Sequence, residues 1–144
     1  MSKVSIVFWS GTGNTAAMAE MIAQGVSEAG GEAVLIPVGE ANVEELKKEK
    51  AFALGCPSMG AEQLEEMEME PFMCELEGGI AGKQIALFGS YGWGNQEWMR
   101  DWEGRVASAG ATVVNGEGIT VNGAPDSDTQ EQCKSVGKAL AQLA

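Results

Sequence analysis

The sequence contains no histidine, and its three cysteines lie far apart. Without an imidazole, histidine-based acid–base catalysis and most zinc sites are excluded. Cys56, Cys74 and Cys133 are an odd number and lack paired spacing, which argues against a disulfide framework and against a thiolate metal site. We therefore expect no metal ion, and we expect the chain to work in a reducing cytoplasm.

Basic residues are also scarce. The chain has 9 Lys and Arg against 21 Asp and Glu, which gives a formal net charge of −12. This balance argues against nucleic acid and anionic membrane surfaces as partners, and it favours basic protein surfaces. No apolar stretch is long enough to span a bilayer, and the N-terminus lacks the pattern of a signal peptide. We expect one domain, residues 1–144, that works as a monomer.

Short apolar segments alternate with helical patterns along the whole chain. Strands that alternate with helices form parallel sheets covered on both faces, so the pattern predicts an α/β three-layer sandwich. The ligand site of such a fold lies outside the carboxyl ends of the strands. The predicted strands are residues 4–8, 33–38, 51–56, 85–88 and 111–114, the last resumed at 119–121.

The helical segments are marked by caps and by apolar residues at helical spacing. They are predicted from the turn after the first strand to about residue 29, over a short segment capped by Asn42, from Pro71, from about 95 to 109, and after Asp126. The positions expected to face inward are Met18, Ile22, Val26, Phe72, Met73, Leu76, Trp98, Trp102, Val106, Cys133, Val136, Gly137 and Leu140.

A turn rich in hydroxyls and glycine, Ser10-Gly11-Thr12-Gly13-Asn14-Thr15, follows the first strand and precedes a helix. Its backbone N–H groups and the helix N-terminus favour a phosphate. It lacks the lysine of a P-loop, and Ala16 stands where a dinucleotide motif has its third glycine. No Lys or Arg occurs between Lys3 and Lys47, so neutral groups would hold the phosphate. The alternative is a plain strand-to-helix connection capped by Asn14.

Two more loops follow the third and fourth strands, at Met59-Gly60 and within Leu87-Phe88-Gly89-Ser90-Tyr91-Gly92-Trp93-Gly94. With the first turn, they resemble the three FMN-binding loops of flavodoxins, most closely the short-chain type of anaerobic bacteria. The resemblance implies the flavodoxin-like fold, with a five-stranded parallel sheet of order 2-1-3-4-5. It also implies one noncovalent FMN and a flavoprotein for electron transport, not an enzyme with its own substrate. Such a protein carries single electrons at low potential between redox enzymes.

The resemblance also implies roles for individual residues. Those expected at the phosphate are Ser10, Thr12, Asn14 and Thr15 through side chains and Gly11 and Gly13 through the backbone. Trp93 is expected on the outer face of the flavin ring and Met59 on its inner face, with Trp9 near the ribityl chain. Expected at the polar edge of the ring are Glu62 and backbone groups of Ser90, Tyr91 and Gly92. The remaining loop positions of the predicted site are Pro57, Ser58, Gly60, Ala61 and Gly94.

Gly60 is the residue to which the resemblance assigns a conformational change. On one-electron reduction, the peptide after Gly60 is expected to turn its carbonyl toward flavin N5, because glycine tolerates the required torsions. The resulting hydrogen bond would stabilise the semiquinone by roughly 1 kcal/mol. Ala61 stands where some family members carry Asp or Gly, and its Cβ biases this turn. Pro57 stands where some relatives have a serine that contacts the phosphate.

The segment from Glu62 to Glu77 contains seven carboxylates and no basic residue. One charge at about 10 Å from the flavin, at an effective dielectric of about 40, would oppose an anionic flavin by roughly 0.8 kcal/mol. Several such charges would make the fully reduced cofactor a strong electron donor. They would also attract basic docking surfaces on redox enzymes, of the kind that serve ferredoxin-type partners.

Two other functions use the same kind of fold. An FMN-dependent quinone or azo reductase would need additional residues to cover a substrate and to bind a nicotinamide, and the sequence has no spare length for them. A noncatalytic receiver-like module would need acidic residues after the first strand, where Trp9-Ser10-Gly11 stands. The electron carrier is therefore the predicted function.

Overall fold

The computed structural model describes residues 3–144, and a parallel sheet forms its centre. The sheet order is β2-β1-β3-β4-β5, as predicted, and β6 also pairs with β4. Two strands share the fifth position, because a 3-10 turn at Val114–Gly116 separates β5 from β6. The strands are β1 (Lys3–Phe8), β2 (Glu32–Pro37), β3 (Ala51–Gly55), β4 (Gln84–Tyr91), β5 (Thr112–Val113) and β6 (Ile119–Asn122).

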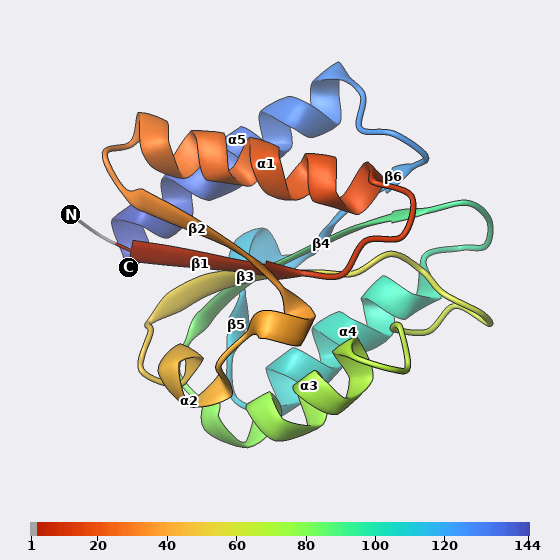
Figure 1. The fold of residues 1–144 in the computed structure, drawn as a ribbon, viewed down its shortest axis with the longest axis horizontal. Coiled ribbons are helices and arrows are strands. Elements are labelled where there is room, and N and C mark those ends of the chain that lie inside the picture. Colours follow the sequence, from red (N-terminus) through yellow and green to blue (C-terminus); the bar gives the residue numbers. More distant parts are fainter. Residues whose placement is uncertain (1–2) are drawn as a thin grey trace.

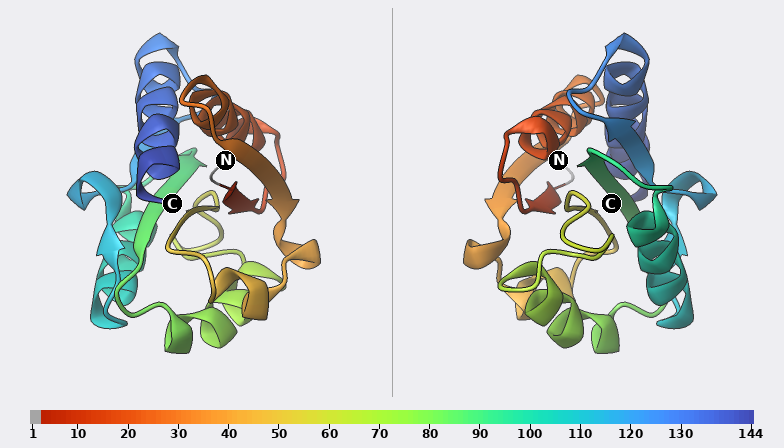
Figure 2. Two further views of the ribbon diagram at one scale, coloured as in Figure 1. Left: turned by 90° about the vertical axis from the view of Figure 1, so that its left-hand side faces the viewer. Right: turned by 90° about the vertical axis from the view of Figure 1, so that its right-hand side faces the viewer.

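Helices cover both faces of the sheet, which confirms the three-layer sandwich (Figure 1). One layer holds α1 (Asn14–Glu28) and α5 (Ser127–Leu143), and the other holds α2 (Val43–Leu46), α3 (Met69–Leu76) and α4 (Glu97–Ser108). Both end views show the sheet twisting between these layers (Figure 2). Within residues 3–144, none of the helices has the length and apolar character that crossing a membrane requires.

The sheet separates two apolar cores. One lies under α3 and α4 and includes the fully buried Trp98 and Trp102, and the other lies under α1 and α5. Every residue of β3 is buried, because neighbouring strands and both helix layers surround it. All the helix positions predicted to face inward are buried, which confirms the helical patterns.

The structure extends one predicted strand, moves the start of one predicted helix and confirms the cap of another. β4 continues through Tyr91, three residues beyond the predicted end, because it pairs with β6 from Phe88 to Tyr91. α3 begins at Met69, so Pro71 lies inside its first turn, where a missing N–H costs no helical hydrogen bond. The predicted cap of α2 is confirmed, since the side chain of Asn42 accepts a hydrogen bond from the N–H of Glu45 at 3.1 Å.

An ion-pair cluster joins α3 to α4. The Arg105 guanidinium donates to Glu70 at 2.7 and 2.8 Å and to Glu77 at 2.8 Å. The hydrogen bonds from Arg105 hold the pKa of Glu70 below its usual 4.5, although partial burial opposes them. Because the folded-state pKa is lowered, the pair stabilises the fold above the ordinary Glu pKa and loses this effect as the pH falls through the lowered value.

Replacing Arg105 with Gln should lower the free energy of unfolding by about 1 kcal/mol at pH 7, a modest figure because the pair is partly exposed to solvent. The difference from the wild type should shrink at acid pH, because the pair loses its effect as the pH falls through the lowered pKa of Glu70. Urea unfolding at pH 7 and at acid pH measures the difference in the free energy of unfolding. Arg100→Gln is the control, because Arg100 is more exposed and pairs at 3.2 and 3.5 Å. Equal losses in both variants at both pH values would contradict the assignment.

Candidate cofactor-binding site

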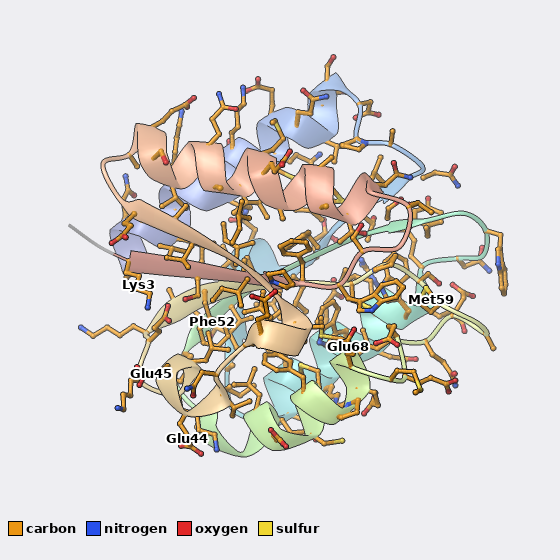
Figure 3. All side chains as sticks on the ribbon, in the orientation of Figure 1. Lys3, Glu44, Glu45, Phe52, Met59 and Glu68 are labelled. Carbon is orange, nitrogen blue, oxygen red and sulfur yellow. The ribbon has the colours of Figure 1, made fainter. Side chains whose placement is uncertain are left out.

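Three loops come together at the carboxyl edge of the sheet, as the strand order predicts. They follow β1 (residues 9–13), β3 (residues 56–68) and β4 (residues 92–96). All three lie at the end of the molecule away from the two termini (Figures 1 and 2). Met59, in the second loop, lies at this end, whereas Lys3, at the start of β1, lies at the opposite end (Figure 3).

The first loop gathers backbone donors around one hydroxyl. The Ser10 Oγ accepts hydrogen bonds from the N–H groups of Gly13 at 3.1 Å and Ala16 at 3.3 Å. Gly13, with a φ of +97°, is the N-cap of α1, so the alternative that Asn14 caps this helix is wrong. The left-handed backbone at Gly13 turns successive N–H groups toward the same side of the loop.

Other donors of this loop have no acceptor in the protein. Within residues 3–144, the N–H groups of Thr12 and Thr15 donate to no protein atom. Thr15 is buried, and its Oγ1 accepts a 3.4 Å hydrogen bond from the N–H of Ser90, which leaves the hydroxyl proton free to donate. Unpaired N–H groups at a helix N-terminus favour an anion.

An open groove of about 770 Å³ runs along this loop. The Trp9 side chain lies across Gly11 and lines the groove. Glu40 and Glu68 also line the groove, and the carboxylate of Glu68 lies against Gly39. None of the residues that line the groove is basic: Phe8, Trp9, Ser10, Gly11, Thr12, Gly13, Ala16, Pro37, Val38, Gly39, Glu40 and Glu68.

The sequence interpretation missed Glu40 and Glu68 because it considered only the glycine-rich loops. The strand order contained the missing signal. Since β2 lies beside β1, the segment that follows β2 must lie beside the first loop, and Glu40 lies in that segment. Glu68 immediately precedes α3, where the second loop ends.

The second loop contains a small hairpin. The N–H of Met59 donates to the carbonyl of Gln63 at 2.9 Å, and the reverse bond is 2.8 Å. Gly60 and Glu62 both have a positive φ, +52° and +54°. Ala61 therefore lies at the tip of the hairpin, between two left-handed residues. For Glu62 this conformation is uncommon, whereas Gly60 adopts it without a Cβ penalty.

The Glu62 carboxylate bonds within the protein, although we expected it at the polar edge of the ligand. Its Oε1 accepts a 2.9 Å hydrogen bond from the N–H of Glu97, at the start of α4, and the group lies beside Gly94. A carboxylate at a helix N-terminus is stabilised by the helix dipole. In this structure Glu62 therefore ties the second loop to the third.

Ser90 lies inside β4 and not in a loop. Its N–H donates to Thr15, its carbonyl accepts from Ser58 N–H at 3.0 Å, and its hydroxyl donates to the carbonyl of Gly123 at 2.6 Å. These contacts occupy the backbone groups that we expected to face the ligand. The carbonyl of Tyr91, also in β4, accepts from Gly123 N–H at 3.0 Å. The expectation that Ser90 and Tyr91 lie in a loop is therefore wrong.

Trp93 is at the exposed tip of the third loop, with 64% of its surface accessible. Gln96, which the sequence interpretation missed, anchors the base of this loop with a left-handed backbone. Its side chain accepts from the Thr120 hydroxyl at 2.5 Å and donates to the Tyr91 hydroxyl at 3.4 Å. An exposed indole on an anchored loop is suited to stack on a flat ligand, because no burial is lost when it turns to the ligand.

Fold and loops together define an α/β protein with three loops at the carboxyl edge of its parallel sheet, the first of them at the N-terminus of α1. The sequence model of the Flavodoxin family matches residues 6–137. The flavodoxin of Clostridium beijerinckii is 46% identical over 140 residues, which cover 97% of this chain and 100% of that protein. The flavodoxin of Megasphaera elsdenii is 45% identical over 138 residues, or 96% of this chain and 98% of that one.

The fold comparison gives the same family. The solution structure of two-electron reduced Megasphaera elsdenii flavodoxin matches with a TM-score of 0.88 at 43% identity, and the match covers 96% of this chain and 98% of that one. This chain belongs to the flavodoxin family, which confirms the resemblance. Its cofactor is FMN and its function is electron transport between redox enzymes, not conversion of a substrate of its own. The reductase and the receiver-like module are not favoured.

Proposed function

We propose that this flavodoxin is a low-potential one-electron carrier whose potentials follow from the charge around its groove. FMN supplies the redox chemistry when bound, and the chain binds, orients and shields it. The lack of basic residues in the groove carries the proposal: its donors are N–H and hydroxyl groups, and among the described residues the charged ones that line it are Glu40 and Glu68. Among the described residues that line the groove, none is a cation that would offset negative charge gained by the cofactor, so the added electron is held weakly.

The three loops divide the work of binding in this proposal. The first loop holds the phosphate through the donors of Ser10, Gly11, Thr12, Gly13, Asn14 and Thr15. The second loop places Met59 against the inner face of the flavin ring and Gly60 near its N5. The third loop places Trp93 against the outer face and the backbone of Gly92 at the polar edge. Ser90 is left out of this set, because its polar groups bond within the protein.

The acidic surface supports redox enzymes with basic docking patches as partners, including those that serve ferredoxin-type carriers. Glu66 and Glu68 are exposed in the second loop, whereas Glu70 and Glu77 are already paired with Arg105. The free carboxylates therefore lie close to the edge where electrons leave. Such an arrangement steers association with a basic surface. We also propose that the chain is a single cytoplasmic domain that works as a monomer.

Reconstitution with FMN tests the proposal. The purified protein should take up one FMN per chain, turn yellow, and release the cofactor on denaturation. In a reductive titration at pH 7, the potential for the second electron should lie below that of free FMN, because the surrounding carboxylates oppose the added charge. Added NaCl should raise this potential by screening them. A protein that stays colourless with excess FMN would contradict the proposal.

A further inference from the structure

The hairpin of the second loop has a fixed stem and a short tip. Two hydrogen bonds between Met59 and Gln63 close the stem, and the tip consists of Gly60, Ala61 and Glu62. The two left-handed residues of the tip flank a single alanine. A conformational change at Gly60 can remain local only where both ends of the stem are held in place.

The first end of the stem is fixed to the sheet. The N–H of Cys56 donates to the carbonyl of Phe88, and that of Ser58 donates to the carbonyl of Ser90, both at 3.0 Å. These bonds continue the pairing of β3 with β4 into the loop. The chain therefore enters the hairpin from a rigid strand.

The second end is held by Glu65, two residues after the hairpin. Its carboxylate accepts three backbone hydrogen bonds, from Met67 at 2.8 Å, Glu68 at 2.7 Å and Met69 at 3.0 Å. Glu65 is only 6% exposed, and among the described residues no Lys or Arg pairs with it. Burial alone would raise the pKa of this carboxyl, but the three N–H donors lower it overall, so Glu65 stays ionised.

Cys56 joins the two ends. Its Sγ accepts a 3.4 Å hydrogen bond from the N–H of Glu65, and its thiol donates to the carbonyl of Pro57 at 3.4 Å. Burial raises the pKa of this thiol to about 12, so it remains protonated and can do both. The first residue after β3 thus contacts the residue two positions after the hairpin.

We propose that Glu65 is a positioning residue for the Gly60 turn. Its carboxylate fixes the segment from Leu64 to Met69 as a rigid support, and Cys56 links this support to the sheet. The change of the Gly60 peptide is thereby confined to the three residues of the tip. This inference rests on the proposed function, since it concerns the same cofactor site.

The contacts require a carboxylate of this length. A glutamine has one acceptor oxygen, and its NH2 group would face a backbone N–H, so at least one of the three bonds would be lost. Aspartate keeps the charge but is one methylene shorter, so its oxygens fall short of the three donors. Glu66, the next residue, is exposed and carries the same charge. Removing that charge changes the electrostatics without touching the support.

Hydrogen exchange in the FMN-loaded protein tests the proposal with Glu65→Gln, Glu65→Asp and Glu66→Gln. Both Glu65 variants should speed exchange of the Met59 and Gln63 amides by at least about tenfold, because hydrogen bonds to an ionised group are strong. They should also raise the Kd for FMN by about tenfold. Glu66→Gln should leave exchange at both amides within about twofold of the wild type. The amides of Phe52 and Leu54 in β3 serve as internal references.

Each outcome either supports or overturns the role of Glu65 in positioning the hairpin. If Glu65→Gln leaves the stem amides unchanged, or speeds them no more than the β3 amides, Glu65 does not position the hairpin. If Glu66→Gln speeds exchange of the stem amides as much as Glu65→Gln does, the loss of one negative charge explains the effect and Glu65 does not position the hairpin. If Glu65→Gln does not fold, Glu65→Asp decides by the same criteria. Failure of the wild type to bind FMN would overturn the proposed function instead, and the exchange comparison would still be read in the FMN-free chain.

Discussion

Replacing Trp93 with Ala should weaken FMN binding by about 10- to 100-fold. The indole is 64% exposed and is held on a loop anchored by Gln96, so it adds little to the core but presents a large flat surface to the flavin. Stacking of an aromatic side chain on a base contributes about 1–3 kcal/mol. The Kd for FMN, measured by quenching of flavin fluorescence, gives the effect directly. Trp93→Phe should lose less, because it keeps a smaller ring.

The same variant should also raise the reduction potential for the second electron. Water that replaces the indole stabilises negative charge better than an aromatic face does, so the reduced cofactor becomes easier to form. Leu143→Ala is a suitable control, because Leu143 is also exposed but lies at the end of α5, away from the three loops. Unchanged affinity and potential in Trp93→Ala would mean that Trp93 does not contact the flavin.

The fold and the first loop could be predicted because each depends on the composition of short segments of the sequence. Short apolar segments such as Ala51–Gly55 alternate with helices, which leaves few possible topologies. The cluster of small polar residues from 10 to 15 marks a turn whatever surrounds it. The left-handed torsions at Gly13 and Gly60 occur where glycine was expected to be needed.

The contacts between loops could not be predicted in the same way. Glu62, Glu65 and Gln96 are ordinary polar residues in an acidic stretch or at a helix start, and most such residues are simply solvated. Their partners, respectively Glu97, the backbone of residues 67–69, and Thr120, are set by how the loops lie against one another. A carboxylate that binds backbone N–H groups leaves no charge pattern in the sequence. Only the three-dimensional arrangement distinguishes Glu65 from Glu66.

The contact between α1 and α5 depends on two glycines, one in each helix. A Cβ at Gly137 would overlap the carbonyl oxygen of Ile22 and lie 2.9 Å from the Val26 nitrogen, and one at Gly25 would overlap the carbonyl oxygen of Lys134. In each case the obstacle is helix backbone, which cannot rotate away as a side chain can. The contact also fixes α1, whose N-terminus carries the phosphate loop.

Gly137→Ala should therefore lower the free energy of unfolding by about 3 kcal/mol or more, although alanine is the better helix former by about 1 kcal/mol. The helices must separate to admit the methyl group, which opens gaps around Met18 and Leu140, both fully buried. Gly104→Ala in α4 is the matched control: its Cβ would meet nothing within 4 Å, so this variant should be slightly more stable. Urea unfolding of both variants measures the difference, and equal stabilities would show that α1 and α5 tolerate a wider spacing.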